Sequence, residues 1–303
     1  MKLIVQPDDG LGPLLHPIRH AKRSVKIMIF RFDRAEMEKA LGAAVSRGVE
    51  VRALIAHSNR GGEGRLRKLE LRLLEAGVTV TRTADEFPRY HGKMAIVDNT
   101  LYVLGFNYTK QDIEKSRSFG LITRESKLVK EAEALFESDS LRQPYQPSHD
   151  RLVVSPETSR KALADFISAA KSQLLIYDER ITDKRMRTLL SDKAASGVDV
   201  RVLGKGDCKI DKVVARRMPF RLHVRAIVRD SNSLFVGSQS LRKLELDGRR
   251  ELGLIVKDAT IAKKIQSVFE TDWENAGGKK EAKAEEKEAA SAEKSGATSS
   301  PAA

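Results

Sequence analysis

The chain has 303 residues, of which 41% are hydrophobic and 32% charged, and its 55 Lys and Arg against 42 Asp and Glu give a net charge of +13. These values are typical of a globular protein and exclude collagen-like, mucin-like and wholly disordered chains. No run of 18 apolar residues predicts a transmembrane helix, and Asp8 and Asp9 come too early for a signal peptide. The single Cys208 cannot form an intramolecular disulfide. We therefore expect a cytoplasmic protein held together by a packed core.

Strand and helix patterns alternate through the first 140 residues. Strands are predicted at 24–32, 49–56, 78–83, 94–97 and 101–104, and helices at 34–47, 65–75 and 131–138. Gly48 and Gly77 follow the first two helices, where a glycine commonly ends a helix. Beyond Pro144 and Pro147 the alternation resumes, with strands at 173–177, 198–203, 222–229 and 233–237 and helices at 184–195 and 259–273. Such alternation predicts an α/β sandwich.

An internal repeat relates the two halves. Residues 47–54 (RGVEVRAL) match 196–203 (SGVDVRVL), and 3–7 (LIVQP) match 152–156 (LVVSP), both 149 residues apart. Residues 100–103 (TLYV) match 233–236 (SLFV), and 118–122 (SFGLI) match 251–255 (ELGLI), both 133 residues apart. The shift falls because residues 59–84 have only a shortened counterpart. Four matches in the same order predict a duplicated unit, with repeats at 1–145 and 146–276.

Each repeat contains one motif of chemical interest. Residues 91–98 read HGKMAIVD and residues 223–230 read HVRAIVRD, with His first, a base third and Asp eighth. Positions one and three of a strand point to the same face, so His91 lies beside Lys93 and His223 beside Arg225. If the two pairs meet across a pseudo-two-fold axis, they form one pocket with two imidazoles and two cations. Such a pocket suits a phosphodiester.

These motifs resemble the phospholipase D superfamily, whose repeated signature is HxKxxxxD followed by GSxN. The second element corresponds to Gly105-Phe106-Asn107 in the first repeat and to Gly237-Ser238-Gln239-Ser240 in the second. The resemblance covers residues 1–276 and is to the soluble, bacterial-type members. It implies an α/β fold in which duplicated α/β/α sandwich units pack as a pseudo-two-fold bilobal structure, with the active site between the repeats.

The resemblance also implies roles for individual residues. His91 is the expected nucleophile, which forms a covalent phosphohistidine, and His223 is the expected general acid and base. Lys93, Arg225 and Asn107 are expected to stabilise the non-bridging oxygens. Asp98 and Asp230 are expected to orient an imidazole or the lysine. The remaining candidates for the substrate pocket are Ser238, Ser240 and Glu251. No metal or other cofactor is implied.

Departures from the signature leave alternatives open. Arg225 replaces a lysine, Ser240 replaces an asparagine, and Phe106 makes the first GSxN element poor. A catalytically impaired phosphodiester-binding protein is therefore one alternative to a phosphodiesterase or phosphatidyltransferase that acts on phospholipids.

Charge distribution adds a second alternative. Residues 201–229 hold nine Lys and Arg against two Asp, an excess that favours an anionic partner. A peripheral contact with an anionic membrane would fit this excess, and so would a nuclease acting on DNA or RNA. The 16 Phe, Trp and Tyr residues leave little material for a base-stacking platform, however. The neutral last segment, 277–303, consists almost wholly of Ala, Glu, Lys, Ser and Gly and is expected to be disordered.

Overall fold

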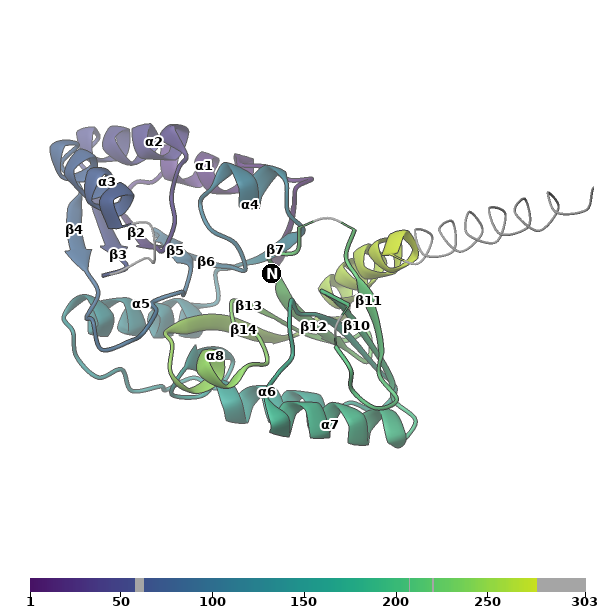
Figure 1. The fold of residues 1–303 in the computed structure, drawn as a ribbon. Coiled ribbons are helices and arrows are strands. Elements are labelled where there is room, and N and C mark those ends of the chain that lie inside the picture. Colours follow the sequence, from purple (N-terminus) through teal and green to yellow (C-terminus); the bar gives the residue numbers. More distant parts are fainter. Residues whose placement is uncertain (58–62, 207, 220, 277–303) are drawn as a thin grey trace, which may run out of the picture.

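Two seven-stranded sheets form the framework of the molecule (Figure 1). The computed structural model describes residues 1–57, 63–206, 208–219 and 221–276. From edge to edge the first sheet contains β1 (Lys2–Gln6), β7 (Ser118–Thr123), β6 (Thr100–Leu104), β5 (Met94–Val97), β2 (Ser24–Ile29), β3 (Glu50–Ile55) and β4 (Thr79–Arg82). In corresponding order the second contains β8 (Leu152–Ser155), β14 (Glu251–Lys257), β13 (Ser233–Gly237), β12 (Arg225–Arg229), β9 (Gln173–Tyr177), β10 (Asp199–Gly204) and β11 (Val214–Arg217). The identical strand order confirms the predicted duplication.

The strands pair in the same sense in both sheets. In the first sheet β2, β3 and β4 run parallel, whereas β5, β6, β7 and β1 add to β2 in antiparallel fashion. The second sheet repeats this pattern from β9 to β8. The middle strands β5 and β13 are buried along their whole length, because both faces of each sheet are covered.

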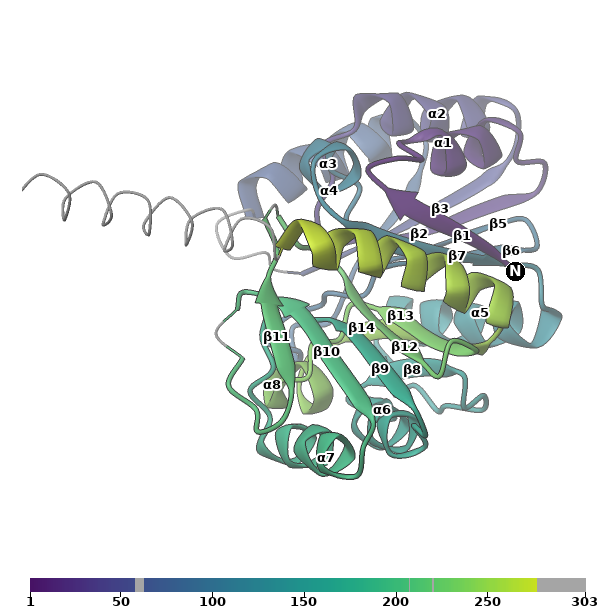
Figure 2. The ribbon, with the colours of Figure 1, turned by 90° about the vertical axis from the view of Figure 1, so that its right-hand side faces the viewer.

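Helices cover the sheets and also fill the space between them (Figure 2). The first repeat contains α1 (Gly12–Arg19), α2 (Ala35–Ser46), α3 (Glu63–Glu75), α4 (Lys110–Glu114) and α5 (Ser126–Ser140). The second contains α6 (Ser159–Ser168), α7 (Lys184–Ala195), α8 (Lys243–Asp247) and a last helix at 259–276. Helices α1, α2 and α3 pack on the outer face of the first sheet, and α6 and α7 pack on that of the second.

One continuous core lies between the two sheets. It joins side chains of both sheets to α5 and to the last helix. Phe119 of β7 packs against Tyr177 of β9, with ring centroids 5.5 Å apart, and Tyr177 in turn packs against Phe269 at 5.1 Å. The two repeats are therefore fixed to each other by buried apolar contacts.

The sheets approach each other most closely beside Gly105. A Cβ atom at this position would lie 3.0 Å from the carbonyl oxygen of Phe119 and 3.2 Å from that of Gly237, in the other repeat. Any larger residue would push the sheets apart at this point, so only glycine fits. The first glycine of the GSxN-like element thus serves the junction between repeats.

Some elements differ from the sequence prediction. Helix α1 was not predicted, because Pro13 and Pro17 interrupt its apolar pattern; Pro13 stands in the first turn, where proline is tolerated. Helix α5 begins at Ser126 rather than at 131. In the described residues between β10 and β11 no helix corresponds to α3, as the shortened counterpart of 59–84 predicted. The predicted disordered tail lies outside the described residues. Within the described ranges, no helix is both long and apolar enough to cross a bilayer.

Candidate active site

The two motif histidines meet where the sheets come together. The ring centroids of His91 and His223 lie 6.2 Å apart, with the rings inclined by 64°. His91 precedes β5 and His223 precedes β12, so equivalent ends of equivalent strands bring the rings together. Both side chains are largely buried, with the side chain of His91 9% exposed and that of His223 14%. This arrangement is the shared pocket that the repeated motif predicted.

Backbone hydrogen bonds tie each histidine to the opposite repeat. The N–H of His91 donates to the carbonyl oxygen of Arg250 at 2.7 Å, and the N–H of His223 donates to that of Arg117 at 3.3 Å. Arg250 and Arg117 immediately precede β14 and β7, which are equivalent strands. The position of each imidazole is therefore set by both repeats.

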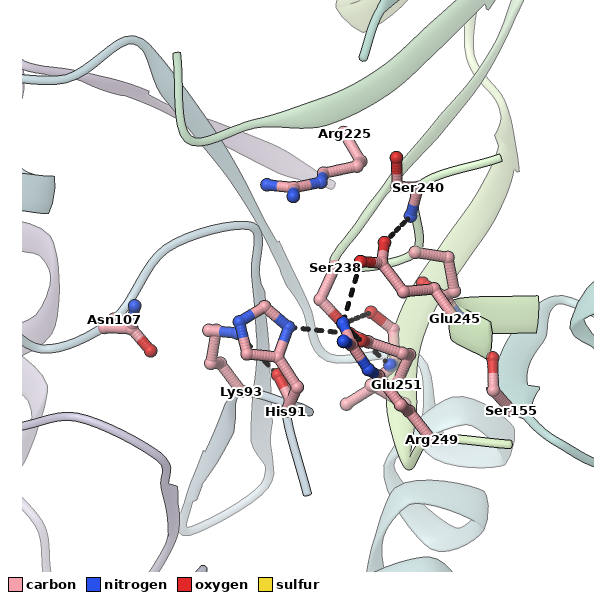
Figure 3. A network of polar contacts seen from close by, with 12 residues as sticks. His91, Lys93, Asn107, Ser155, Arg225, Ser238, Ser240, Glu245, Arg249 and Glu251 are labelled. Carbon is pink, nitrogen blue, oxygen red and sulfur yellow. Dashed lines mark hydrogen bonds and ion pairs between the residues drawn. The ribbon is translucent and has the colours of Figure 1, made fainter. Parts of the chain in front are cut away.

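Glu251 orients the imidazole of His91. The Nδ1 atom of His91 lies 2.8 Å from Oε2 of Glu251, which is the first residue of β14 and is fully buried (Figure 3). A buried carboxylate at this distance accepts the Nδ1 proton, which leaves the lone pair of the neutral ring on Nε2. Burial raises the pKa of Glu251, although Lys93 opposes this shift. Glu251 thus contacts the histidine, whereas the sequence suggested a place in the substrate pocket.

His223 has a different carboxylate neighbour, Asp112 of α4. Its Nδ1 atom lies 3.4 Å from Oδ2 of Asp112, a residue that is buried and also forms an ion pair with Arg221. The Asn107 side-chain amide donates to the same carboxylate oxygen at 2.7 Å and lies 3.5 Å from Nε2 of His223. Burial disfavours the charge on Asp112, but His223 and Arg221 outweigh it and hold the pKa of the carboxyl at about 2. The resulting negative charge stands beside His223.

Sequence reasoning missed Asp112. Its signal is the repeat itself: the backbone N–H of Asn107 donates to Asp112 at 3.0 Å, and that of Ser240 donates to Glu245 at 2.8 Å. Both acids stand five residues after the polar end of the GSxN-like element. Comparing these offsets would have singled out both carboxylates.

The two motif cations complete the pocket. Lys93 is fully buried, and burial lowers its pKa to about 7 even though the Glu251 carboxylate opposes the shift. Arg225 is also buried, and its guanidinium lies 3.6 Å from Glu179. Burial lowers the pKa of both histidines well below the usual range; Lys93 and Arg225 add to the effect at His91, whereas Asp112 opposes it at His223. A bound phosphodiester anion would reverse these shifts, because it favours every neighbouring positive charge.

The motif aspartates lie elsewhere, which corrects the sequence prediction. Asp98 follows β5 and accepts hydrogen bonds from the backbone N–H groups of residues 22, 23 and 24, the shortest at 2.8 Å. Asp230 does the same for residues 171, 172 and 173. Seven residues of extended chain separate each aspartate from its histidine, a span of about 23 Å. Neither aspartate orients the imidazole or the lysine; each fixes the loop that leads into β2 or β9.

Ser238 and Ser240 have protein partners of their own. The Ser240 hydroxyl donates to the buried carboxylate of Asp178, and the Ser238 hydroxyl donates to the carbonyl oxygen of Leu252 at 3.3 Å and accepts from the N–H of Leu252 at 3.0 Å. A hydroxyl has one proton, so neither serine has one left for a phosphate oxygen. In this structure both serines support the pocket walls (Figure 3).

The basic run 201–229 does not form a free positive surface. Arg201 pairs with Glu270 at 2.7 Å, Arg221 pairs with Asp112, and Lys205 pairs with Glu179 at 2.5 Å. The guanidinium of Arg216 donates to the carbonyl oxygen of Trp273 at 2.8 Å. Much of the local charge excess is thus neutralised inside the protein.

This duplicated fold with paired histidines defines a phospholipase D-like protein. A sequence model of the family described as "Cardiolipin synthase, PLD-like domain" matches residues 14–140 and 163–273. The chain belongs to this family.

Individual relatives agree with this assignment. The chain is 32% identical over 143 residues to a mitochondrial cardiolipin hydrolase of Xenopus tropicalis, a match that spans 46% of this chain and 65% of the relative. Among solved structures, a polyphosphate kinase from Porphyromonas gingivalis superposes with a TM-score of 0.74 at 17% identity, over 90% of this chain and 50% of the kinase. A phosphatidylserine synthase from Haemophilus influenzae superposes with a TM-score of 0.68 at 10% identity, over 88% of this chain and 85% of the synthase. These two superpositions establish the shared fold.

Proposed function

We propose that the protein is a phospholipase D-like phosphodiesterase or phosphatidyltransferase that acts on phospholipids through a covalent phosphohistidine. The observation that carries this proposal is the pair of imidazoles 6.2 Å apart, each beside its own buried carboxylate. That spacing lets one phosphorus atom sit between a nucleophile on one side and a proton donor on the other. Lys93 and Arg225 supply positive charge around the same space.

The reaction has two steps. In the first, Nε2 of His91 attacks phosphorus, a P–N bond forms and the P–O bond to the leaving alcohol breaks, while His223 gives its Nε2 proton to the leaving oxygen. In the second, neutral His223 takes a proton from water or an alcohol, whose oxygen attacks phosphorus as the P–N bond breaks. The side-chain amide of Asn107, 3.5 Å from the His223 ring, is placed to donate to a non-bridging oxygen.

The unequal surroundings of the histidines support this division of roles. Glu251 takes the Nδ1 proton of His91 at 2.8 Å and leaves Nε2 free to attack. At His223 the negative charge of Asp112 is the strongest influence that raises the pKa. The proton is therefore held more readily on His223, as a general acid requires.

Three observations favour a phospholipid as the substrate. The family description names a cardiolipin synthase, and the relative at 32% identity is named a cardiolipin hydrolase. The internal pairing of the basic run removes much of the charge that favoured nucleic acid.

The test offers purified protein three kinds of phosphodiester. These are a fluorescent phospholipid in neutral-detergent micelles, single-stranded DNA and a bis-aryl phosphodiester, each with and without EDTA. We expect lipid turnover that EDTA does not affect, with a phosphohistidine adduct at His91 detected by mass spectrometry after a rapid alkaline quench. His91→Asn should abolish both turnover and adduct, whereas His16→Asn, on the exposed surface of α1, should change neither.

The remaining outcomes contradict specific parts of the proposal. Undiminished turnover by His91→Asn would refute the nucleophile, and activity confined to DNA would make the protein a nuclease. Binding of the substrates without turnover would make it a catalytically impaired phosphodiester-binding protein.

A further inference from the structure

A second pair of cations lies beside His91. Arg89 precedes His91 by two residues, so along an extended chain Arg89, His91 and Lys93 project to the same side. The carbonyl oxygen of Arg89 accepts the N–H of Arg250 at 3.1 Å, next to the bond that fixes His91. The base of the Arg89 side chain is therefore held as firmly as the histidine.

The equivalent arginine of the second repeat is neutralised, but Arg89 is not. Arg221 precedes His223 by two residues and forms an ion pair with Asp112. The counterpart of Asp112 is Glu245, whose Oε1 atom instead pairs with Arg242 and, at 2.8 Å, with Arg249. Among the residues that the structure describes, Arg89 has no carboxylate partner within ion-pair distance.

Phe30 connects these cations to the nucleophile. The ring centroid of Phe30 lies 4.8 Å from that of His91, in an edge-on arrangement. The guanidinium carbons of Arg89 and Arg31 lie 5.3 and 5.6 Å from the same ring centroid. One aromatic ring thus separates both guanidinium groups from the His91 imidazole.

These like charges disfavour one another. Arg89 is partly buried, and burial together with the positive charges of Arg249 and Arg31 lowers its pKa. The Phe30 ring stabilises a cation over its face only modestly. A bound anion would relieve the repulsion and supply the acceptors that two arginine forks lack.

We propose that Arg31 and Arg89 form a second anion subsite, which binds a second phosphate of the phospholipid substrate next to the phosphodiester being cleaved. This inference rests on the proposed function. Because a single ring separates the subsite from His91, a short linker of a few carbon atoms suffices to join the two phosphates. The substrate class is therefore a phospholipid whose head group carries a second phosphate, as in a bis-phosphatidyl lipid.

The test compares two lipids with the same scissile bond. Cardiolipin has the second phosphate and phosphatidylglycerol lacks it; both are presented dilute in neutral-detergent micelles. We expect the wild-type protein to prefer cardiolipin in kcat/KM, and Arg89→Gln to lose roughly tenfold on cardiolipin, as for one charge-assisted hydrogen bond, with little change on phosphatidylglycerol. Arg31→Gln should act in the same direction. Arg185→Gln, which removes the same charge from the exposed surface of α7, should leave the preference intact.

Two outcomes would overturn the subsite: no preference in the wild-type protein, or an equal loss on both lipids in Arg89→Gln. A preference that appears only between the dinucleotides pTpT and TpT would overturn the assignment to a lipid.

A binding measurement separates failure of the subsite from failure of the proposed function. Calorimetry with His91→Asn compares methylenediphosphonate with methylphosphonate, neither of which needs to react. We expect tighter binding of the diphosphonate and loss of this difference in the double variant His91→Asn/Arg89→Gln. If the protein cleaves no phosphodiester but shows this pattern, the proposed function fails and the subsite stands. If the diphosphonate binds no more tightly, the subsite fails whatever the activity.

Discussion

The Nδ1 atom of His223 lies 3.4 Å from Oδ2 of Asp112, a carboxylate that belongs to the other repeat. By the internal symmetry the place that Glu251 takes beside His91 belongs to Ser118, whose hydroxyl donates to the His223 carbonyl oxygen at 3.1 Å. Asp112 therefore supplies from α4 the negative charge that the strand end does not supply. The two histidines are supported by acids from non-equivalent positions, so their roles need not be interchangeable.

Asp112→Asn should weaken proton transfer by His223. Without the carboxylate the pKa of His223 falls further, because Asp112 is the strongest influence that raises it. We expect kcat to fall about tenfold to a hundredfold, as for other groups that orient a reacting histidine, and the alkaline limb of the pH–rate profile to move to lower pH. Measurement of kcat from pH 5 to 9 checks both. An unshifted limb would mean that Asp112 serves the fold alone; Asp165→Asn, on the exposed surface of α6, is the control.

Glu251→Gln should slow the formation of the phosphoenzyme. Glutamine keeps the size of the side chain, but its amide does not fix the Nδ1 proton of His91 as the carboxylate does at 2.8 Å. We expect about a hundredfold loss in the first step, seen as a lower rate of adduct formation in rapid-quench experiments. Formation at the wild-type rate would show that Glu251 is not the residue that orients His91.

Lys93 should give the activity an alkaline limit near neutral pH. Burial lowers its pKa to about 7, so in the free enzyme the positive charge is lost as pH rises through that value. We expect kcat/KM to decline above pH 7 and the decline to move to higher pH in Lys93→Arg, because arginine stays charged. An identical limb in both proteins would assign the decline to another group.

The same lysine makes a prediction about stability. Its native pKa lies below the ordinary value of about 10.4, so between pH 7 and 10 the unfolded chain binds more protons than the native protein. Stability relative to Lys93→Met should therefore rise with pH across this interval. Chemical denaturation at pH 6, 8 and 10 measures the difference, and a constant difference would contradict the shift.

Asp98→Asn should affect stability and spare catalysis. Asp98 accepts three backbone N–H groups, has φ of 51° and lies at the far end of β5 from His91. Asparagine tolerates this backbone but loses one charged acceptor, so we expect a loss of about 1–3 kcal/mol in the free energy of unfolding and an unchanged kcat. Backbone hydrogen bonds lower the pKa of Asp98 against the effect of burial, so the loss should shrink as pH falls below 4. A large fall in kcat of the folded protein would restore the role first expected for this aspartate.

Sequence could predict the duplication and the meeting of the histidines, because both follow from local patterns. The 149- and 133-residue matches fall on equivalent strands, such as β3 with β10 and β7 with β14. Strand alternation placed His91 beside Lys93 on one face. These features depend on period and order, which a chain displays directly.

The partners of the histidines could not be predicted in the same way. Asp112 and Glu251 reach an imidazole across the junction between repeats, 111 and 160 residues away along the chain. Asp98 belongs to the motif by spacing, and only the length of β5 shows that it points to a different end of the strand. Contacts made by packing leave no local signal.

The crossed backbone bonds from His91 to Arg250 and from His223 to Arg117 mean that neither half of the chain contains a complete active centre. A polypeptide of one repeat would need a second copy to hold its histidine in place, and two identical copies would give two identical histidines. Fusing the copies into one chain removes that constraint, because mutations can then accumulate separately on each side. The replacement of a glutamate by Ser118 in one half and the unpaired Arg89 in the other record such divergence. Gene duplication thus turned a symmetric catalyst into one whose two sides can evolve separate tasks.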